Sequence, residues 1–336
     1  MNGPDAGNPE PRLVVQTSPY LRQGVTTPGL MRDVLLALAP VVVAAGWHFG
    51  TSGLLVVAAA TAGAMATERL FQGRGTLADG SAAVTGLILG LTLPPGLPLW
   101  MAFLGGVAAI GLGKLIWGGL GHNLFNPALV GRAFLQAAFP TALTTWHAPG
   151  DPWSLRGGTF ALPFLQAQTV DGTTAATPLN LMREQLTPSI ELLRGDVAGS
   201  VGETSAVVIL LAGLYLLARR AFDYRIPAGI LIAVGLFSAV LHYSRPGDYP
   251  PPAFMLLSGG LLYGAVFMAT DPVTSPLSPR GAWIFGFGVG ALVVLIRLWG
   301  SLPEGVMYAI LLMNAATPLL DRVTQPRVFG RGRRKS

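Results

Sequence analysis

The chain contains no cysteine among its 336 residues, and only 11% of its residues are charged. Without thiols it forms no disulfides, thiolate-ligated zinc sites or cysteine-ligated iron–sulfur clusters, and it has no cysteine nucleophile. The charge content is less than half of the roughly 25% typical of soluble domains. The net charge of +6 comes from few side chains, so there is no dense basic face and we expect no nucleic-acid partner.

Hydrophobic residues make up 51% of the chain, and its 44 glycines and 27 prolines lie among long apolar runs. Closely packed and interrupted membrane helices have this composition. About 20 apolar residues cross a bilayer core. The sequence contains ten candidates, some of them short: Asp33–Phe49, Ser52–Thr67, Ala82–Leu93, Leu97–Leu112, Asn126–Phe139, Thr204–Ala218, Ile226–Tyr243, Ala253–Ala269, Ala282–Leu298 and Gly305–Leu319. We therefore predict an all-α polytopic membrane protein that contacts membrane lipid.

The candidate spans form two groups of five, separated by a hydrophilic insert. The predicted domains are a cytoplasmic N-terminal segment 1–32, a first transmembrane repeat 33–139, an external insert 140–203, a second transmembrane repeat 204–320 and a basic cytoplasmic tail 321–336. An odd number of spans in each group gives the groups opposite orientations, so we expect two inverted five-helix repeats. Short spans interrupted by glycine and proline then point to a site near the midplane, although both residues are common in membrane helices generally.

The basic residues set the orientation of these spans. With the N-terminus in the cytoplasm, 16 of the 22 Lys and Arg residues lie in cytoplasmic segments. Arg132 and Arg297 lie within or at the end of a span, and the others lie outside: Arg156, Arg183, Arg194 and Arg245. The positive-inside rule therefore predicts that both termini are cytoplasmic and that the insert is external.

Three charged residues stand out in or beside the predicted spans. Asp79 and Asp271 lie at the cytoplasmic ends of third spans, where they either line a cofactor or ion vestibule or cap a helix or turn. Arg132 lies six residues into the fifth span. A charge inside the membrane is costly and indicates a function by default, but a long side chain near a helix end also snorkels to the interface. No Asp or Glu lies in the middle of a predicted span, so this chain alone shows no carboxylate relay for protons or sodium.

The insert contains a loop of small and hydroxyl-bearing residues, VDGTTAATPL at 170–179. Taken alone, such a loop is usually an ordinary turn. Its hydroxyls lack a histidine base nearby in the sequence, which argues against nucleophilic catalysis, and we predict neither a catalytic residue nor a metal site. A hydroxyl with small neighbours in an exposed segment is, however, accessible to a modifying enzyme.

This loop resembles the flavinylation motif Asp-x-x-Ser/Thr-Gly-Ala-Thr, in which a flavin transferase joins FMN to the last threonine through a phosphoester. Ala175 stands where the family usually has glycine. Other stretches within 17–330 resemble the D subunits of Rnf complexes, the ion-translocating ferredoxin:NAD oxidoreductases, and more distantly the B subunits of sodium-pumping NADH:quinone reductases. They include DGSA at 79–82, HNLFNPA at 122–128, GR at 131–132, MATDPVTSP at 268–276, PEGV at 303–306 and NAATP at 314–318.

The resemblance implies a flavoprotein of the bacterial inner membrane that carries electrons between partner subunits while the complex translocates Na⁺ or H⁺. Thr177 would hold FMN covalently on the periplasmic side. Thr174 and Ala176 would shape the loop, and Asp171 would help the transferase to recognise it. The family is also associated with a second, non-covalent flavin, riboflavin or FMN. The candidate residues for that flavin are Asn126, Arg132, Asp271 and Thr274.

The resemblance also implies partners for this chain. They are the flavin transferase and the other subunits of an Rnf-type complex, including subunits with iron–sulfur centres and a second flavin-bearing subunit. Three alternatives stay open. The chain could be a B-type subunit of a sodium-pumping quinone reductase, a channel for a small solute built from inverted repeats, or a structural scaffold of the complex.

Overall fold

The computed structural model describes residues 26–73, 75–150, 153, 155, 158–162, 176–179, 186–203, 205–300 and 304–325. Within these ranges the regular secondary structure is helical, without strands. The helices up to residue 139, the first half, are α1 (Thr27–Gln72), η1 (Thr76–Asp79), α2 (Ser81–Leu91), α3 (Leu99–Ile110), η2 (Gly111–Leu115) and α4 (Pro127–Ala138). The insert contains α5 (Pro140–Thr144) and α6 (Ser189–Arg194). The helices after residue 204, the second half, are α7 (Ala206–Ala218), α8 (Arg225–Ser244), α9 (Pro252–Leu257), α10 (Leu261–Tyr263), η3 (Gly264–Met268), α11 (Pro279–Trp299) and α12 (Val306–Thr324).

Helix α1 contains both of the first two predicted spans and is interrupted at Gly50. The backbone of Gly50 has φ 71° and ψ −163°, a conformation that is accessible to glycine and strained for other residues. This break divides α1 into segments 27–49 and 51–72. At 1.5 Å per residue, each segment is about 33 Å long, which is enough to cross a hydrocarbon core of about 30 Å.

The eighth predicted span, Ala253–Ala269, is not a continuous helix. It consists of α9, a break at residues 258–260, the short α10 and the π-helical η3. Gly259 lies at the break with φ 61°. The side chain of Arg297 on α11 donates hydrogen bonds to the carbonyl oxygens of Met255 (2.6 Å) and Ser258 (2.9 Å). These bonds satisfy carbonyl groups that the interrupted helix leaves without an intrahelical partner.

Length and hydropathy support a membrane protein. In the described chain, α1, α8, α11 and α12 are long and apolar enough to cross a membrane, while α2, α7 and the stretch Leu99–Leu115 are shorter apolar helices. These helices coincide with predicted spans to within a few residues. The grouping into ten spans and two inverted repeats stays a prediction.

Close backbone contacts hold the helices of each half together. In the first half, Gly63 on α1 lies against the backbone of Phe103, and Gly106 on α3 lies against that of Ala60, so a Cβ atom fits at neither glycine. In the second half, Gly229 on α8 and Gly286 on α11 approach each other in the same manner. Small residues at such crossings are typical of membrane helix packing.

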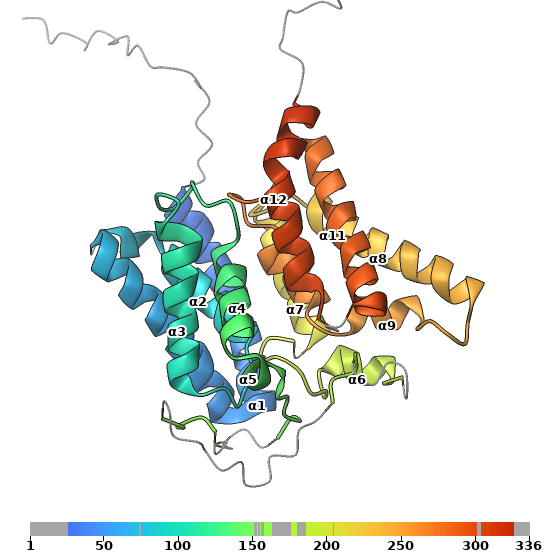
Figure 1. The fold of residues 1–336 in the computed structure, drawn as a ribbon, viewed down its shortest axis with the longest axis horizontal. Helices are drawn as coiled ribbons and strands as arrows, with labels where there is room; N and C mark the ends of the chain where they lie inside the picture. The colour runs from blue at the N-terminus through green and yellow to red at the C-terminus, as the bar shows by residue number, and fades with distance from the viewer. Residues whose placement is uncertain are drawn as a thin grey trace, which may run out of the picture.

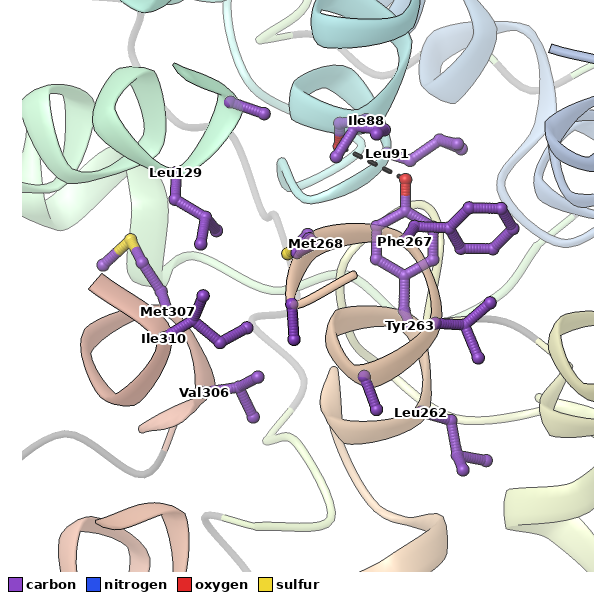
Figure 2. Packing of buried hydrophobic residues seen from close by; sticks show 14 of the residues in the cluster. Ile88, Leu91, Leu129, Leu262, Tyr263, Phe267, Met268, Val306, Met307 and Ile310 are labelled. Atoms are coloured by element: carbon purple, nitrogen blue, oxygen red, sulfur yellow. Dashed lines mark hydrogen bonds between the residues drawn. The ribbon is translucent and has the colours of Figure 1, made fainter. Parts of the chain in front are cut away.

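The two halves meet along an apolar seam. Figure 2 shows Ile88 and Leu91 of α2 opposite Tyr263 and Phe267 of the broken segment, and the Tyr263 hydroxyl donates to the carbonyl oxygen of Ile88 at 3.4 Å. In the same view, Leu129 of α4 lies near residues of α12. One hydrophobic core cluster therefore includes side chains from both halves.

The two ends of the molecule are formed by different segments of the chain. In Figure 1, α1 begins and α12 ends at the top of the view, whereas α5, α6 and α9 lie toward the bottom. The insert helices are therefore at the end opposite to the start of α1 and the end of α12. The predicted orientation of the insert and the termini relative to the membrane stays a prediction.

Candidate functional site

A cavity of about 740 Å³, partly open to the surroundings, lies between the two halves. Its walls come from the starts of α1, α2 and α4 and from η3 and the end of α7. The polar side chains among its lining residues belong to Ser81, Thr85, Lys114, Asn123, Asn126, Thr270 and Asp271. Apolar walls with a few convergent polar groups are typical of sites for cofactors.

Asn126 joins the two halves at this cavity. Its Oδ1 caps α4 by accepting hydrogen bonds from the backbone N–H groups of Ala128 (3.0 Å) and Leu129 (3.5 Å). Its Nδ2 donates to the carbonyl oxygen of Met268, 142 residues away, at 3.0 Å. Pro127 occupies the first turn, as is common at helix N-termini. Asn126 thus fixes a helix N-terminus, which favours electron-rich groups, against the end of η3.

The two candidate aspartates both close local turns. Asp271 accepts hydrogen bonds from the Val273 N–H (3.3 Å) and the Thr274 hydroxyl (3.2 Å). Thr274 is buried, and its carbonyl oxygen accepts from the Thr317 hydroxyl of α12 at 3.1 Å. Asp79 accepts from the N–H (2.7 Å) and hydroxyl (2.6 Å) of Ser81. Asp271 also lines the cavity, whereas Asp79 is not among its lining residues.

A buried ion pair contributes one of its members, Lys114, to the cavity wall. The Lys114 ammonium donates to Glu68 Oε2 at 2.8 Å and to Ser81 Oγ at 2.6 Å. The Lys114 and Glu68 side chains are 2% and 0% exposed, so a cation is held at the cavity although its charge is matched. Lys114 counts among the cytoplasmic charges in the sequence-based topology. The structure shows that its side chain is buried inside the protein, in the π-helical turn η2, and the side of the membrane on which it lies stays a prediction.

A second region surrounds Thr177 in the insert. Of the motif residues, the structure describes Ala176 and Thr177, while Asp171, Thr174 and Ala175 lie outside the described residues. Ala176 is exposed, and Thr177 is 4% exposed. Thr177 lines a cavity of about 340 Å³. Leu192 of α6, Gly259 of the helix break and two carboxylates, Glu203 and Glu304, line the same cavity.

Arg132 belongs to this second region and not to the cavity near Asn126. Its guanidinium donates to the carbonyl oxygen of Thr92 and to the carboxylate of Glu304. The side chain is therefore directed into the protein instead of snorkelling to an interface. It lines a cavity of about 350 Å³ together with Glu203, Glu304 and Tyr263.

The structure brings together some of the predicted residues and adds others. Asn126 and Asp271 line one cavity with Thr274 supporting Asp271, whereas Arg132 and Thr177 lie in the other region. The contributions of Lys114, Glu68, Glu203 and Glu304 were not predicted. Charge at the ends of apolar runs was the signal for them, together with the PEGV stretch at 303–306 for Glu304, and neither signal reveals their partners, which are distant in sequence.

Comparison with known proteins identifies similar chains over nearly the whole length. The sequence profile of the NQR2, RnfD, RnfE family matches residues 14–330. The D subunit of an ion-translocating oxidoreductase complex from Stutzerimonas stutzeri is 42% identical, covering 91% of this chain and 92% of the relative. The D subunit of the proton-translocating ferredoxin:NAD(+) oxidoreductase complex of Clostridium ljungdahlii is 38% identical (95% and 96% covered). The Na(+)-translocating counterpart of Acetobacterium woodii is 37% identical (96% of each chain covered).

Proposed function

Since this chain belongs to the NQR2, RnfD, RnfE family, we propose that it is the membrane-embedded D subunit of an Rnf-type ion-translocating oxidoreductase complex. Its relatives named as D subunits cover more than nine tenths of the chain, which favours this assignment over a B-type subunit of a quinone reductase. The complex resides in the bacterial inner membrane, with the insert on the periplasmic side. Its coupling ion is Na⁺ or H⁺, and the relatives' names include both.

The proposed role of this subunit is to carry electrons through FMN joined to Thr177. The observation that carries this proposal is the motif at 171–177, together with the place of Thr177 at the wall of a cavity. Ala176 beside Thr177 is exposed, whereas Thr177 itself is 4% exposed, and the cavity that Thr177 lines has apolar and charged walls. When bound, FMN supplies one-electron chemistry, while the protein supplies its position and electrostatic surroundings.

The test is flavin fluorescence of the subunit on a denaturing gel, after co-expression with the flavin transferase. We expect a fluorescent band for the wild type and for Thr144→Ala, a control at an exposed threonine of α5. We expect no fluorescence for Thr177→Ala, and mass spectrometry of the wild-type peptide should place FMN on Thr177. A dark wild-type band would reject the proposal and favour the small-solute channel. Unchanged electron transfer by a dark Thr177→Ala complex would favour the structural scaffold.

We propose a second, non-covalent flavin, riboflavin or FMN, in the 740 Å³ cavity. Asn126, Asp271 and Lys114 provide polar groups there, and Thr274 holds Asp271 in place. Arg132 is left out because it lines a different cavity. Acid denaturation should release this flavin from the wild type and from Thr177→Ala, and much less from Asp271→Ala. Equal release from Asp271→Ala would move the flavin elsewhere.

The remaining cofactors of the proposed complex belong to its partners. Because this chain has no cysteine, cysteine-ligated iron–sulfur centres reside in other subunits, as does NAD chemistry. A partner with a second covalent flavin and the flavin transferase complete the proposed set.

A further inference from the structure

Four charged side chains lie close together near the insert, and they come from both halves of the molecule. Arg132 of α4 donates to the Glu304 carboxylate, which precedes α12. Glu203 precedes α7, and its Oε1 would lie 2.7 Å from a Cβ atom on Gly260 at the helix break. Arg297 of α11 reaches the same break through its hydrogen bonds to the carbonyls of Met255 and Ser258. The two guanidinium groups and two carboxylates therefore form one compact cluster.

The two carboxylates lie between two cavities. Glu203 and Glu304 line the 340 Å³ cavity that contains Thr177 and also the 350 Å³ cavity that contains Arg132 and Tyr263. Arg132 holds Oε2 of Glu304. Within the described chain, the buried Oε1 of Glu304 accepts no hydrogen bond. The atom without a hydrogen-bond partner is thus a carboxylate oxygen of Glu304, and Glu304 lines the same cavity as Thr177.

The surroundings of Glu304 balance its charged and neutral forms. Burial raises the pKa of the Glu304 carboxyl to about 7, and the nearby Glu203 acts in the same direction. Arg132 and Arg297 oppose this by favouring the charged form. A carboxyl group with a pKa near neutrality changes its protonation when a single charge is added nearby.

We propose that Glu304 is the protonation site linked to reduction of the flavin on Thr177, an inference that rests on the function proposed above. When a one-electron carrier of a partner subunit delivers an electron to that flavin, the Glu304 carboxylate takes one proton from water at its Oε1. When the electron passes to the next one-electron carrier, the carboxyl group returns the proton to water. One electron and one proton thus enter and leave together, and the buried site gains no net charge.

The sign of the effect sets the pH range. Burial raises the pKa of the carboxyl group to about 7, and negative charge added nearby by reduction raises that pKa further. Between these two pKa values, reduction takes up a proton, so the midpoint potential of the flavin falls as pH rises. Below pH 7 the group is protonated in both states, and well above the higher value it is ionised in both. In neither range does Glu304 make the midpoint potential of the flavin depend on pH.

The experiment is a redox titration of the assembled complex as a function of pH. The contribution of the Thr177 flavin is isolated as the difference from Thr177→Ala. We expect an inflection near pH 7 in the wild type and in Glu191→Gln, a matched control at an exposed carboxylate of α6. Glu304→Gln, which keeps an acceptor for Arg132, should lose the inflection, and Glu304→Asp should restore it at a shifted pH. Proton uptake by the flavin ring itself is common to all variants.

The outcomes separate the two proposals. An unchanged inflection in Glu304→Gln, with the flavin present on Thr177, overturns this inference and leaves the proposed function intact. A wild-type complex without flavin on Thr177 overturns both. If Glu304→Gln does not assemble, infrared difference spectra of the wild type decide. The proposal is supported if the C=O band of a carboxylic acid grows on reduction between pH 7 and 8. The band should be absent at that frequency in Glu304→Asp. Its absence rejects it.

Discussion

Lys114 is a buried cation whose charge is balanced by a residue 46 positions earlier. Its side chain is 2% exposed, and that of Glu68 is fully buried. Desolvation of both charges is costly, and their attraction repays that cost only while both partners are present. Ser81 extends the network, because it accepts from Lys114 and donates to Asp79.

We therefore expect Lys114→Met alone to destabilise the protein by about 3–5 kcal/mol, because it leaves the buried Glu68 without its partner. The double variant Lys114→Met/Glu68→Met should recover most of this loss. Unfolding of the purified protein in detergent, followed by circular dichroism, measures both changes. The half-exposed pair Arg225–Asp223 is the control, and Arg225→Met should cost at most about 1 kcal/mol. Similar costs for the single and double variants would contradict this interpretation.

Individual residues show where prediction from the sequence ends. An arginine within an apolar run indicated that Arg132 is either functional or snorkels to the interface, because the cost of a charge in a membrane is a local property. Its partner Glu304 is 172 residues away, and no local pattern connects the two. The burial of Lys114 was not predicted for the same reason. It depends on Glu68, 46 residues earlier, and not on the residues next to Lys114 in the sequence.

At the scale of elements, Gly50 decides how the first two spans are connected. Its φ of 71° with ψ of −163° is a conformation that costs residues with a Cβ atom about 1–3 kcal/mol. We expect Gly50→Ala to lower the stability of the protein in detergent by this amount. Gly111→Ala is the control, because Gly111 has space for a Cβ atom and no positive φ, and it should change stability by less than about 0.5 kcal/mol. Equal effects of both substitutions would show that the break at Gly50 tolerates side chains.

The positions of most elements follow from hydropathy, but their continuity does not. Apolar runs predicted the places of α2, α4, α7, α8, α11 and α12 to within a few residues, because each run is limited by polar or proline-containing segments. The eighth predicted span is broken because Gly259 permits a left-handed turn and Arg297 donates hydrogen bonds to the freed carbonyls. The first of these causes is visible in the sequence as Gly259-Gly260, whereas the second depends on tertiary packing.

At the scale of the whole molecule, the two proposed flavin sites lie toward opposite ends. The cavity near Asn126 is lined by the start of α1 and the end of α7, whereas Thr177 lies with α6 and the residue before α12. Figure 1 shows the start of α1 and the helix α6 at opposite ends of the fold. Sequence reasoning placed Asp271 and Thr177 on opposite sides through charge distribution alone. It did not predict the buried cluster of Arg132, Glu203, Arg297 and Glu304, because these residues come from segments that are distant in the sequence and belong to both halves.

The orientation of the whole molecule can be tested because the natural chain contains no cysteine. Trp153 in the insert is 85% exposed, and Leu277, between η3 and α11, is 88% exposed. In spheroplasts treated with a membrane-impermeant maleimide, we expect labelling of Trp153→Cys. We expect labelling of Leu277→Cys only after the membrane is permeabilised, because the positive-inside rule places that loop in the cytoplasm. The cysteine-free wild type is the blank. The reverse pattern would place the insert in the cytoplasm, and with it Thr177 and the proton exchange proposed for Glu304.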